Sequence, residues 1–285
     1  MTPRQPGAAG RLYVVATPIG NMADITLRAV RVMGEVDVVA AEDTRTARKL
    51  LTHHGVRTQL VSYHAHNEQQ RTPELLARMQ SGDSVAIVSE AGTPSISDPG
   101  YRLVQAAIDA GIDVEPIPGP SALLAALVVS GLPTDAFVFD GFLPRRGAER
   151  RRRLEALRDE PRTLVFFEAP HRLDACLGDV LDVLGDRPAA LCRELTKMHE
   201  EVRRGSLSEI VAGIGRDPVR GEIVLVVSGL QDAATPDIDG AVDEVLSRTT
   251  TGESMREATR VVAAERGVPR RALYDRVLVR RREKA

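Results

Sequence analysis

The sequence predicts an α/β fold, with two successive α/β units and a small helical module after them. The chain has 285 residues, 43% of them hydrophobic, which is enough for two compact cores and an appendage. Short runs of β-branched residues alternate with helical patterns, as in βαβ units. A polar stretch broken by Pro and Gly, QDAATPDIDG at 231–240, then separates a basic tail from the rest.

The first unit, expected over 11–120, contains five candidate strands. They are 12–16, 36–41, 59–63, 85–89 and 113–117. Segments between them, such as 102–110, have a helical pattern, so we expect a largely parallel, doubly wound sheet. Such sheets bind ligands at the carboxyl ends of their strands.

The second unit, expected over 121–232, contains four more candidate strands. They are 137–142, 163–167, 189–193 and 223–227. The last of these is fully apolar, which is typical of a strand in the centre of a sheet.

The tail, expected over 240–285, reads as a helix-turn-helix module. Ser254 is suited to cap a helix that ends at Gly267, and a second helix follows from Pro269. From Pro269 onwards, seven basic residues stand against two acidic ones, as a phosphate-binding surface requires. A solvated, arginine-rich terminal helix is the alternative. The candidate RNA contacts here are Arg270, Arg271, Arg280, Arg281 and Arg282.

Composition limits the other classes of function. Lys and Arg number 38 against 40 Asp and Glu, so any nucleic-acid surface must be local. Cys176 and Cys192 lack a metal-binding spacing, which argues against a zinc site or a disulfide framework. The N-terminus has no signal-peptide core, and no apolar run approaches the roughly 20 residues of a membrane span. We expect a cytoplasmic protein with no bound metal and no membrane partner.

The stretch VSEAGTPSISDPG at 88–100 follows a predicted strand and is nearly free of bulky side chains. Small residues let the backbone approach a ligand closely, and prolines reduce the entropy lost on binding. Neither a GxGxxG nor a Walker sequence is present, so the loop is predicted to cradle a ligand and not to grip phosphate. The similar loops TPIGN (17–21) and PGPSA (118–122) are expected at the same sheet edge.

The run RRGAERRRR at 145–153 is dense in arginine. Such a run repels itself when unpaired, so it is predicted to be a flexible basic loop beside the cleft, with a solvated helix start as the alternative. Its RNA-contact candidates are Arg145, Arg146, Arg150 and Arg151.

Six segments in order carry a family resemblance: TPIGN, AEDTR, SEAGTPSISDPGYRL, PIPGPSA, FFEAPHRL and CRELTKMHEE. Together they resemble the tetrapyrrole-methylase-like superfamily of S-adenosylmethionine-dependent methyltransferases, over about 12–228. Within it they are most similar to the bacterial branch that methylates the 2′-oxygen of a cytidine in small-subunit (16S) ribosomal RNA. The resemblance implies a two-domain class III fold, a homodimer, S-adenosylmethionine in the cleft between domains, and ribosomal RNA or the assembled small subunit as partner.

The resemblance also implies cofactor contacts in four segments. These are Gly92, Thr93, Pro94, Ser97, Asp98 and Pro99 after the fourth strand, Pro120, Ser121 and Ala122 after the fifth, and Phe167, Glu168, Glu194 and Leu195 in the second domain. The superfamily often has GDPxxY in the first of these loops, whereas this chain has Ser97 in place of the glycine.

Methyl transfer to a ribose hydroxyl needs positioning and benefits from a base or a stabilising cation. Glu42 or Asp43 is a candidate base, and Arg45 a candidate phosphate anchor or electrostatic stabiliser. Alternatively, Asp43 caps a helix and pairs with Arg45. Lys197 is a further candidate cation, unless it forms a surface ion pair with Glu200 or Glu201.

Two other functions stay open on the sequence. A methyltransferase of the same fold acting on a tetrapyrrole or other small molecule would have no use for a basic tail. A DNA-binding regulator with a ligand-sensing domain would take the tail as primary, but it leaves the three converging loops without a role.

Overall fold

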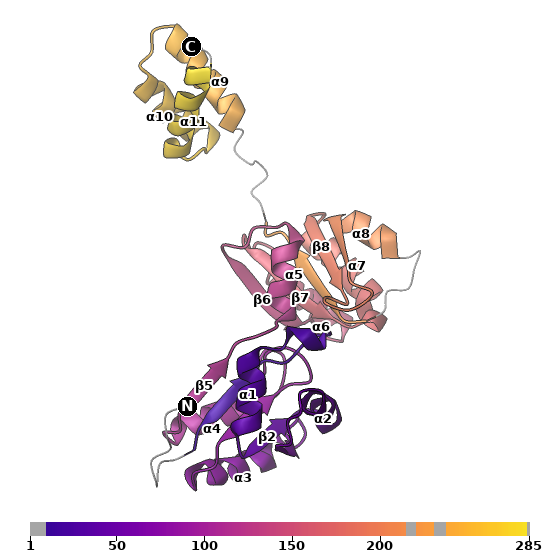
Figure 1. Ribbon diagram of the computed structural model, residues 1–285. Helices are drawn as coiled ribbons and strands as arrows, with labels where there is room; N and C mark the ends of the chain where they lie inside the picture. Colours follow the sequence, from indigo (N-terminus) through magenta and orange to yellow (C-terminus); the bar gives the residue numbers. More distant parts are fainter. Residues whose placement is uncertain (1–9, 215–220, 231–237, 284–285) are drawn as a thin grey trace. The chain divides into compact units, whose positions relative to one another are not determined.

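The computed structural model describes residues 10–214, 221–230 and 238–283. The chain forms two compact units, Met1–Leu230 and Gln231–Ala285 (Figure 1). The first unit contains both predicted α/β parts, each with its own sheet. A domain boundary near residue 120 therefore stays a prediction.

The first sheet is parallel throughout, in the order β3-β2-β4-β1-β5. Its strands are β1 (Leu12–Val15), β2 (Val38–Ala41), β3 (Gln59–Ser62), β4 (Val85–Val88) and β5 (Val114–Ile117). Each lies within two residues of its predicted range. The doubly wound arrangement is confirmed, because side chains alternate between two core clusters on opposite faces.

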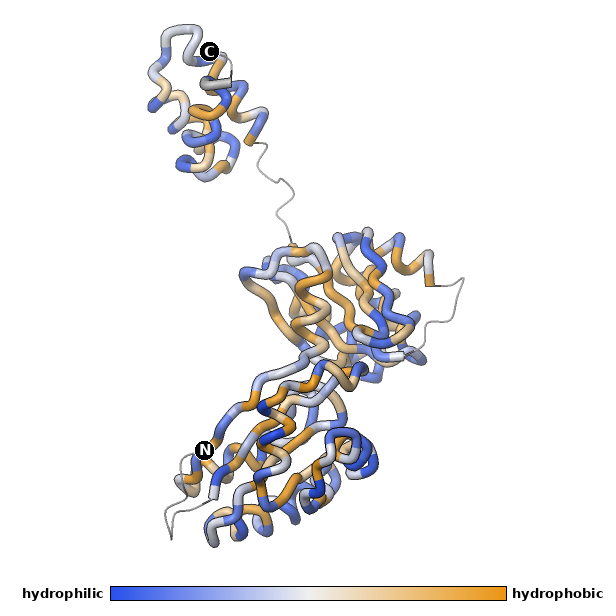
Figure 2. The backbone as a smooth tube through the Cα atoms, viewed as in Figure 1, coloured by the Kyte–Doolittle hydropathy of each residue, from blue (hydrophilic) through white to orange (hydrophobic). Residues whose placement is uncertain are grey.

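Helices cover both faces of this sheet. They are η1 (Met22–Asp24), α1 (Leu27–Glu35), α2 (Thr44–His53), α3 (Glu68–Gln80) and α4 (Tyr101–Asp109). Helices α1 and α2 contribute Met33, Leu50 and Leu51 to one cluster. Helices α3 and α4 contribute Met79 and Leu103 to the other, and Figure 2 shows hydrophobic residues along the strands between these layers.

The second sheet is mixed, in the order β6-β7-β10-β8-β9. Its strands are β6 (Phe137–Phe142), β7 (Thr163–Glu168), β8 (Pro188–Arg193), β9 (Glu201–Ser206) and β10 (Ile223–Val227). Strand β10 is central, as its apolar sequence predicts, and runs antiparallel to β7 and β8. Strand β9 was not predicted, because its sequence EVRRGS has no apolar run; it is an edge strand held by backbone pairing with β8.

The helices of this half are α5 (Ala122–Ser130), α6 (Gly147–Glu155), η2 (Pro170–Arg172), α7 (Leu173–Leu184) and α8 (Leu207–Ile214). Helix α5 packs on one face of the sheet. Helices α6, α7 and α8 pack on the other. Ile19, from the loop after β1, also joins the α5 cluster, so the first half is anchored in the core of the second.

The second compact unit is a three-helix module of α9 (Ile238–Thr250), α10 (Met255–Arg266) and α11 (Arg270–Glu283). Ser254 caps α10 by accepting a 3.2 Å hydrogen bond from the Glu257 amide, and Gly267 ends it at φ 64°, as predicted. Helix α9 was not predicted; its Val242 and Val245 complete a core that α10 and α11 alone would leave open. Residues 231–237 of the predicted linker lie outside the described residues.

Candidate active site

The three glycine- and proline-containing loops of the first half meet at one edge of its sheet, as predicted. Thr17 and Gly92 exchange two backbone hydrogen bonds of 2.8 and 3.0 Å, which join the loops after β1 and β4. Gly92 has φ 75°, and a Cβ there would lie 3.5 Å from Ile19 Cγ2 and 3.9 Å from the Pro120 carbonyl. All three loops therefore crowd around one glycine.

Backbone strain concentrates in two of the loops that face this edge. Among the described residues, positive φ at a non-glycine occurs at Ser95, Ser97, Glu194 and Thr196. Ser97 occupies the position where the superfamily often has glycine, and its φ of 65° lies in the region that glycine prefers. Such conformations persist only where the surroundings fix them, and they cluster at ligand sites.

A cavity of about 600 Å³ lies between these loops and the second sheet, within the first compact unit. Its volume is that of a small-molecule site. Nine of the predicted cofactor residues line it: Gly92, Thr93, Ser97, Asp98, Ser121, Ala122, Phe167, Glu168 and Glu194. The other four do not. Pro94, Pro99, Pro120 and Leu195 lie within the same loops, and Leu195 packs into the α5 cluster.

Sequence reasoning missed Gly221 and Glu222, which also line the cavity. The rule that ligands bind where parallel strands end does not find them, because they precede β10. Since β10 is antiparallel to β7 and β8, its beginning lies at the edge where those strands end. Their only sequence signal is a glycine directly before a fully apolar strand.

Acidic groups dominate the cavity. Its titratable lining residues are Glu42, Glu90, Asp98, Glu168, Glu194, Glu222 and Lys197. Burial, together with the negative charges of Glu42, Glu90 and Glu222, raises the pKa of Asp98 to about 6, although a hydrogen bond with the Ser89 side chain acts in the opposite direction.

Lys197 joins the two halves of the unit. Its Nζ lies 2.9 Å from Glu194 Oε1 and 3.3 Å from Glu222 Oε2, so the alternative pairing with Glu200 or Glu201 is wrong. Burial alone would lower the pKa of Lys197, but these carboxylates outweigh it and the pKa is raised. Its stem packs over Gly20, where an added Cβ would overlap Lys197 Cγ.

The residues of AEDTR separate into different environments. Asp43 caps α2: its Oδ1 accepts a 2.7 Å hydrogen bond from the Arg45 amide, which lowers the pKa of Asp43. The Arg45 guanidinium lies 3.5 Å from Asp43 Oδ2 and is 89% exposed. Glu42, by contrast, lines the cavity and accepts a 3.2 Å hydrogen bond from the Glu90 amide. The capping alternative for Asp43 is thus observed.

A second cavity of about 210 Å³ adjoins the first. The two share Ile19, Glu90, Ala91, Lys197 and Glu222 in their linings. Its apolar floor comes from the core beneath α1 and α2, and Thr17, Thr46 and Ser89 add hydroxyl groups. Lys197 therefore stands on the boundary between two spaces.

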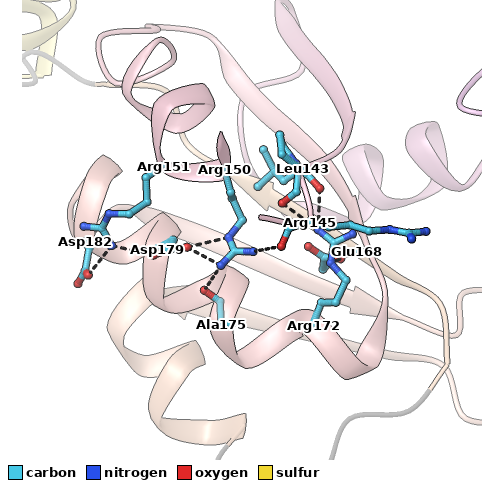
Figure 3. Close-up of polar contacts among 10 residues, drawn as sticks. Leu143, Arg145, Arg150, Arg151, Glu168, Arg172, Ala175, Asp179 and Asp182 are labelled. Carbon is cyan, nitrogen blue, oxygen red and sulfur yellow. Dashed lines mark hydrogen bonds and ion pairs between the residues drawn. The ribbon is translucent and has the colours of Figure 1, made fainter. Parts of the chain in front are cut away.

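The prediction of a flexible basic loop at 145–153 is wrong, because most of this run forms α6. Arg150 was a candidate RNA contact, but its side chain is only 8% exposed, and its Nη2 lies 2.6 Å from Asp179 (Figure 3). Arg151 pairs with Asp179 at 2.7 Å and Asp182 at 3.1 Å. The carboxylates of α7 remove the repulsion on which the loop prediction rested. Arg145 and Arg146 are exposed.

In the helical module, Arg270, Arg271 and Arg281 are exposed. Arg280 instead pairs with Asp239 of α9 at 2.7 Å. The side chain of Arg282 lies outside the described residues. A basic surface on α11 stays a prediction, with three of its five arginines seen in exposed positions.

Two α/β halves around a cavity at the carboxyl edge of a parallel sheet define a protein that binds a small molecule at that edge. A sequence profile of the tetrapyrrole (corrin/porphyrin) methylases matches residues 11–211. The chain therefore belongs to this family of methyltransferases, and it has the predicted fold.

Two relatives match more of the chain than the profile does, so their match extends into the tail. "Ribosomal RNA small subunit methyltransferase I" of Halalkalibacterium halodurans is 46% identical over 93% of this chain and 94% of its own length. The protein of the same name from Mesorhizobium japonicum is 49% identical over 94% of this chain and 91% of its own.

A solved structure of uroporphyrin-III C-methyltransferase from Thermus thermophilus, complexed with S-adenyl homocysteine, superposes with a TM-score of 0.54. It is 24% identical and covers 77% of this chain and 97% of its own. At that identity the likeness shows the fold alone.

Proposed function

We propose that this protein transfers the methyl group of S-adenosylmethionine to the ribose 2′-hydroxyl of a cytidine in small-subunit ribosomal RNA. The observation that carries the proposal is the pair of adjoining cavities with Lys197, Glu90 and Glu222 on their shared boundary. One cavity has the size of a cofactor site, and the other offers the acceptor a place beside it. The two relatives named above carry a ribosomal RNA substrate in their names.

The residues of the larger cavity fit S-adenosylmethionine. Gly92 has no side chain, so its backbone is open to a ligand at the cavity wall. Glu168 is buried, and its Oε2 has no hydrogen-bond partner among the described residues. Several carboxylates suit a ligand that carries an ammonium and a sulfonium group. When bound, the cofactor supplies an electrophilic methyl group. Gly92, Thr93 and Ser97 would hold it from the first half.

The chain's own part in the chemistry is to orient the acceptor and stabilise its oxygen as the proton leaves. Lys197 presents a cation at the boundary of the cavities, where a developing alkoxide gains most from it. Glu42 is a carboxylate within the same cavity and is the candidate to receive the proton. Asp43, occupied as a helix cap, is the weaker candidate base, and exposed Arg45 is suited to a phosphate.

The RNA partner, free or in the assembled small subunit, is proposed to contact Arg145, Arg146, Arg270, Arg271 and Arg281. Each of these arginines is exposed. A positive surface of this kind positions an RNA backbone. We place this activity in the cytoplasm, where ribosomal RNA is available. No helix within the described ranges is both long and apolar enough to cross a bilayer.

A homodimer is part of the proposal. Helix α5 is apolar on all sides, yet Val128 is 72% exposed and Leu124 52% exposed. A helix of this composition is normally buried all round, so a second copy of the chain is the proposed cover for its outer face.

Transfer of labelled methyl from S-adenosylmethionine to small subunits that lack their native methylations tests the function. The expected product carries the label on a cytidine 2′-oxygen, located by nuclease digestion and mass mapping. Lys197→Met should lower the rate at least tenfold, whereas Lys49→Met, on the outer side of α2, should not change it. Label on a base, or on a tetrapyrrole instead of RNA, would contradict the proposal.

A further inference from the structure

The carboxylates of the larger cavity divide into two groups. Three have a cationic partner: Glu168 lies 3.3 Å from Arg172 Nε, and Glu194 and Glu222 pair with Lys197. Of these contacts, the Glu168–Arg172 pair is neutral, and Lys197 neutralises one of its two carboxylates. They explain the position of Lys197 without any ligand.

The second group is Glu42, Glu90 and Asp98. No ion pair joins any of them to a Lys, Arg or His within the described part of the chain. Among the described residues, the Glu42 side chain accepts a hydrogen bond only from the backbone amide of Glu90. These three acids stand on the loops after β2 and β4, so the topology of the first sheet brings them to one wall of the cavity.

Like charges at one wall oppose their own ionisation unless a cation enters. The pKa of Asp98 is raised first by burial and then by the negative charges of Glu42, Glu90 and Glu222, against a hydrogen bond with Ser89 that lowers it. The other titratable groups that line the cavity are Glu168, Glu194 and Lys197. The free cavity thus carries more negative charge than its own cations neutralise.

We infer that Glu42, Glu90 and Asp98 select the charge of the cofactor, so that the cavity binds S-adenosylmethionine more tightly than S-adenosylhomocysteine. The inference takes its cofactor from the proposed function. The methylated form carries one positive charge more, on sulfur, and is otherwise nearly the same molecule. A neutral thioether loses the attraction of all three carboxylates. Spent cofactor would therefore leave more readily than fresh cofactor.

Titration calorimetry with each ligand tests the inference. Wild-type protein at pH 8 should bind S-adenosylmethionine roughly tenfold or more tightly than S-adenosylhomocysteine. Asp98→Asn, Glu42→Gln and Glu90→Gln should each weaken the first ligand by roughly three- to tenfold and the second by less than twofold. Asp109→Asn, an exposed acid at the end of α4, is the charge-matched control and should change neither.

The pH dependence provides an independent readout. Bound cation favours the ionised form of Asp98, so binding of S-adenosylmethionine should release a proton below about pH 6 and weaken as the pH falls from 7 to 5. The affinity for S-adenosylhomocysteine should vary less with pH. In Asp98→Asn the two ligands should show the same pH dependence.

Equal affinities in wild type, or equal losses for both ligands in the three variants, would overturn the charge selection while leaving the cofactor assignment intact. If neither ligand binds to folded wild-type protein, the proposed function itself fails. Circular dichroism of each variant establishes that it is folded before its affinities are compared.

Discussion

Asp98 is expected to destabilise the unliganded protein. Its folded pKa of about 6 exceeds the unfolded value of roughly 4. The folded state therefore binds the extra proton, and stability falls as the pH rises from about 4 to 6. Above about pH 6 the ionised Asp98 lowers the free energy of unfolding by an amount that no longer changes with pH. Asp98→Asn should raise the free energy of unfolding by about 1–2 kcal/mol at pH 8, after a discount for partial exposure.

Urea unfolding at pH 8 and pH 4.5 measures this effect. At pH 4.5 the gain should be clearly smaller than at pH 8, since Asp98 is then largely protonated in the folded protein. A gain of equal size at both pH values would instead assign the effect to packing. If Asp98→Asn is more stable than wild type but binds the cofactor less tightly, Asp98 lowers the stability of the free protein in favour of binding.

Gly20 allows the close approach of Lys197. An added Cβ would overlap Lys197 Cγ and lie 2.9 Å from Cε, so Gly20→Ala must displace the lysine stem. We expect methyl transfer to fall at least tenfold, because the Lys197 cation moves off the boundary of the cavities. Gly34→Ala is the control: its Cβ would meet only Val56, at 3.8 Å, and it should retain activity.

At the scale of elements, α6 is held to α7 by Arg150. Arg150→Ala would leave Asp179 with only the half-exposed Arg151 as partner. We expect a loss of about 2–4 kcal/mol in the free energy of unfolding, measured by urea titration. Arg152→Ala, an exposed neighbour, should stay within about 0.5 kcal/mol. Comparable losses for the two would show that the Asp179 contacts do not stabilise the helix.

Helix α11 is expected to carry phosphate contacts. Replacing Arg270, Arg271 and Arg281 with Ala should weaken RNA binding and lower the slope of log affinity against log salt by about 2. Filter binding across a salt series measures both. The control is Arg28→Ala with Arg31→Ala on α1, which also removes exposed positive charge. If the control lowers RNA affinity and the salt slope by as much per arginine removed, the effect comes from net charge and not from contacts of α11.

For the whole molecule, the outer face of α5 provides the test of assembly. Val128→Glu should convert a dimer to a monomer in analytical ultracentrifugation, because a charge cannot be buried unpaired in an apolar interface. Val279→Glu makes the same replacement at an exposed valine of α11 and should leave the assembly unchanged. A wild-type monomer at micromolar concentration would exclude the proposed dimer.

The sequence by itself determined nine of the ten strands in the described residues, the order of the units and the meeting of three loops. Those features follow from local patterns: apolar runs fix strands such as β10, and small residues after β1, β4 and β5 must share an edge once the sheet is parallel. Ser254 and Gly267 likewise mark the ends of α10 through local capping chemistry.

Only the tertiary structure decided which charged side chains are free. Arg150 and Arg145 lie in the same basic run, but Arg150 is buried against Asp179, 29 residues away, whereas Arg145 is exposed. Lys197 pairs with Glu222 and not with its near neighbour Glu200 because antiparallel β10 brings Glu222 to the end of β8. Charge pairing depends on distances across the fold, which a linear pattern does not contain. Local propensity therefore predicts elements, and only packing assigns partners to their charges.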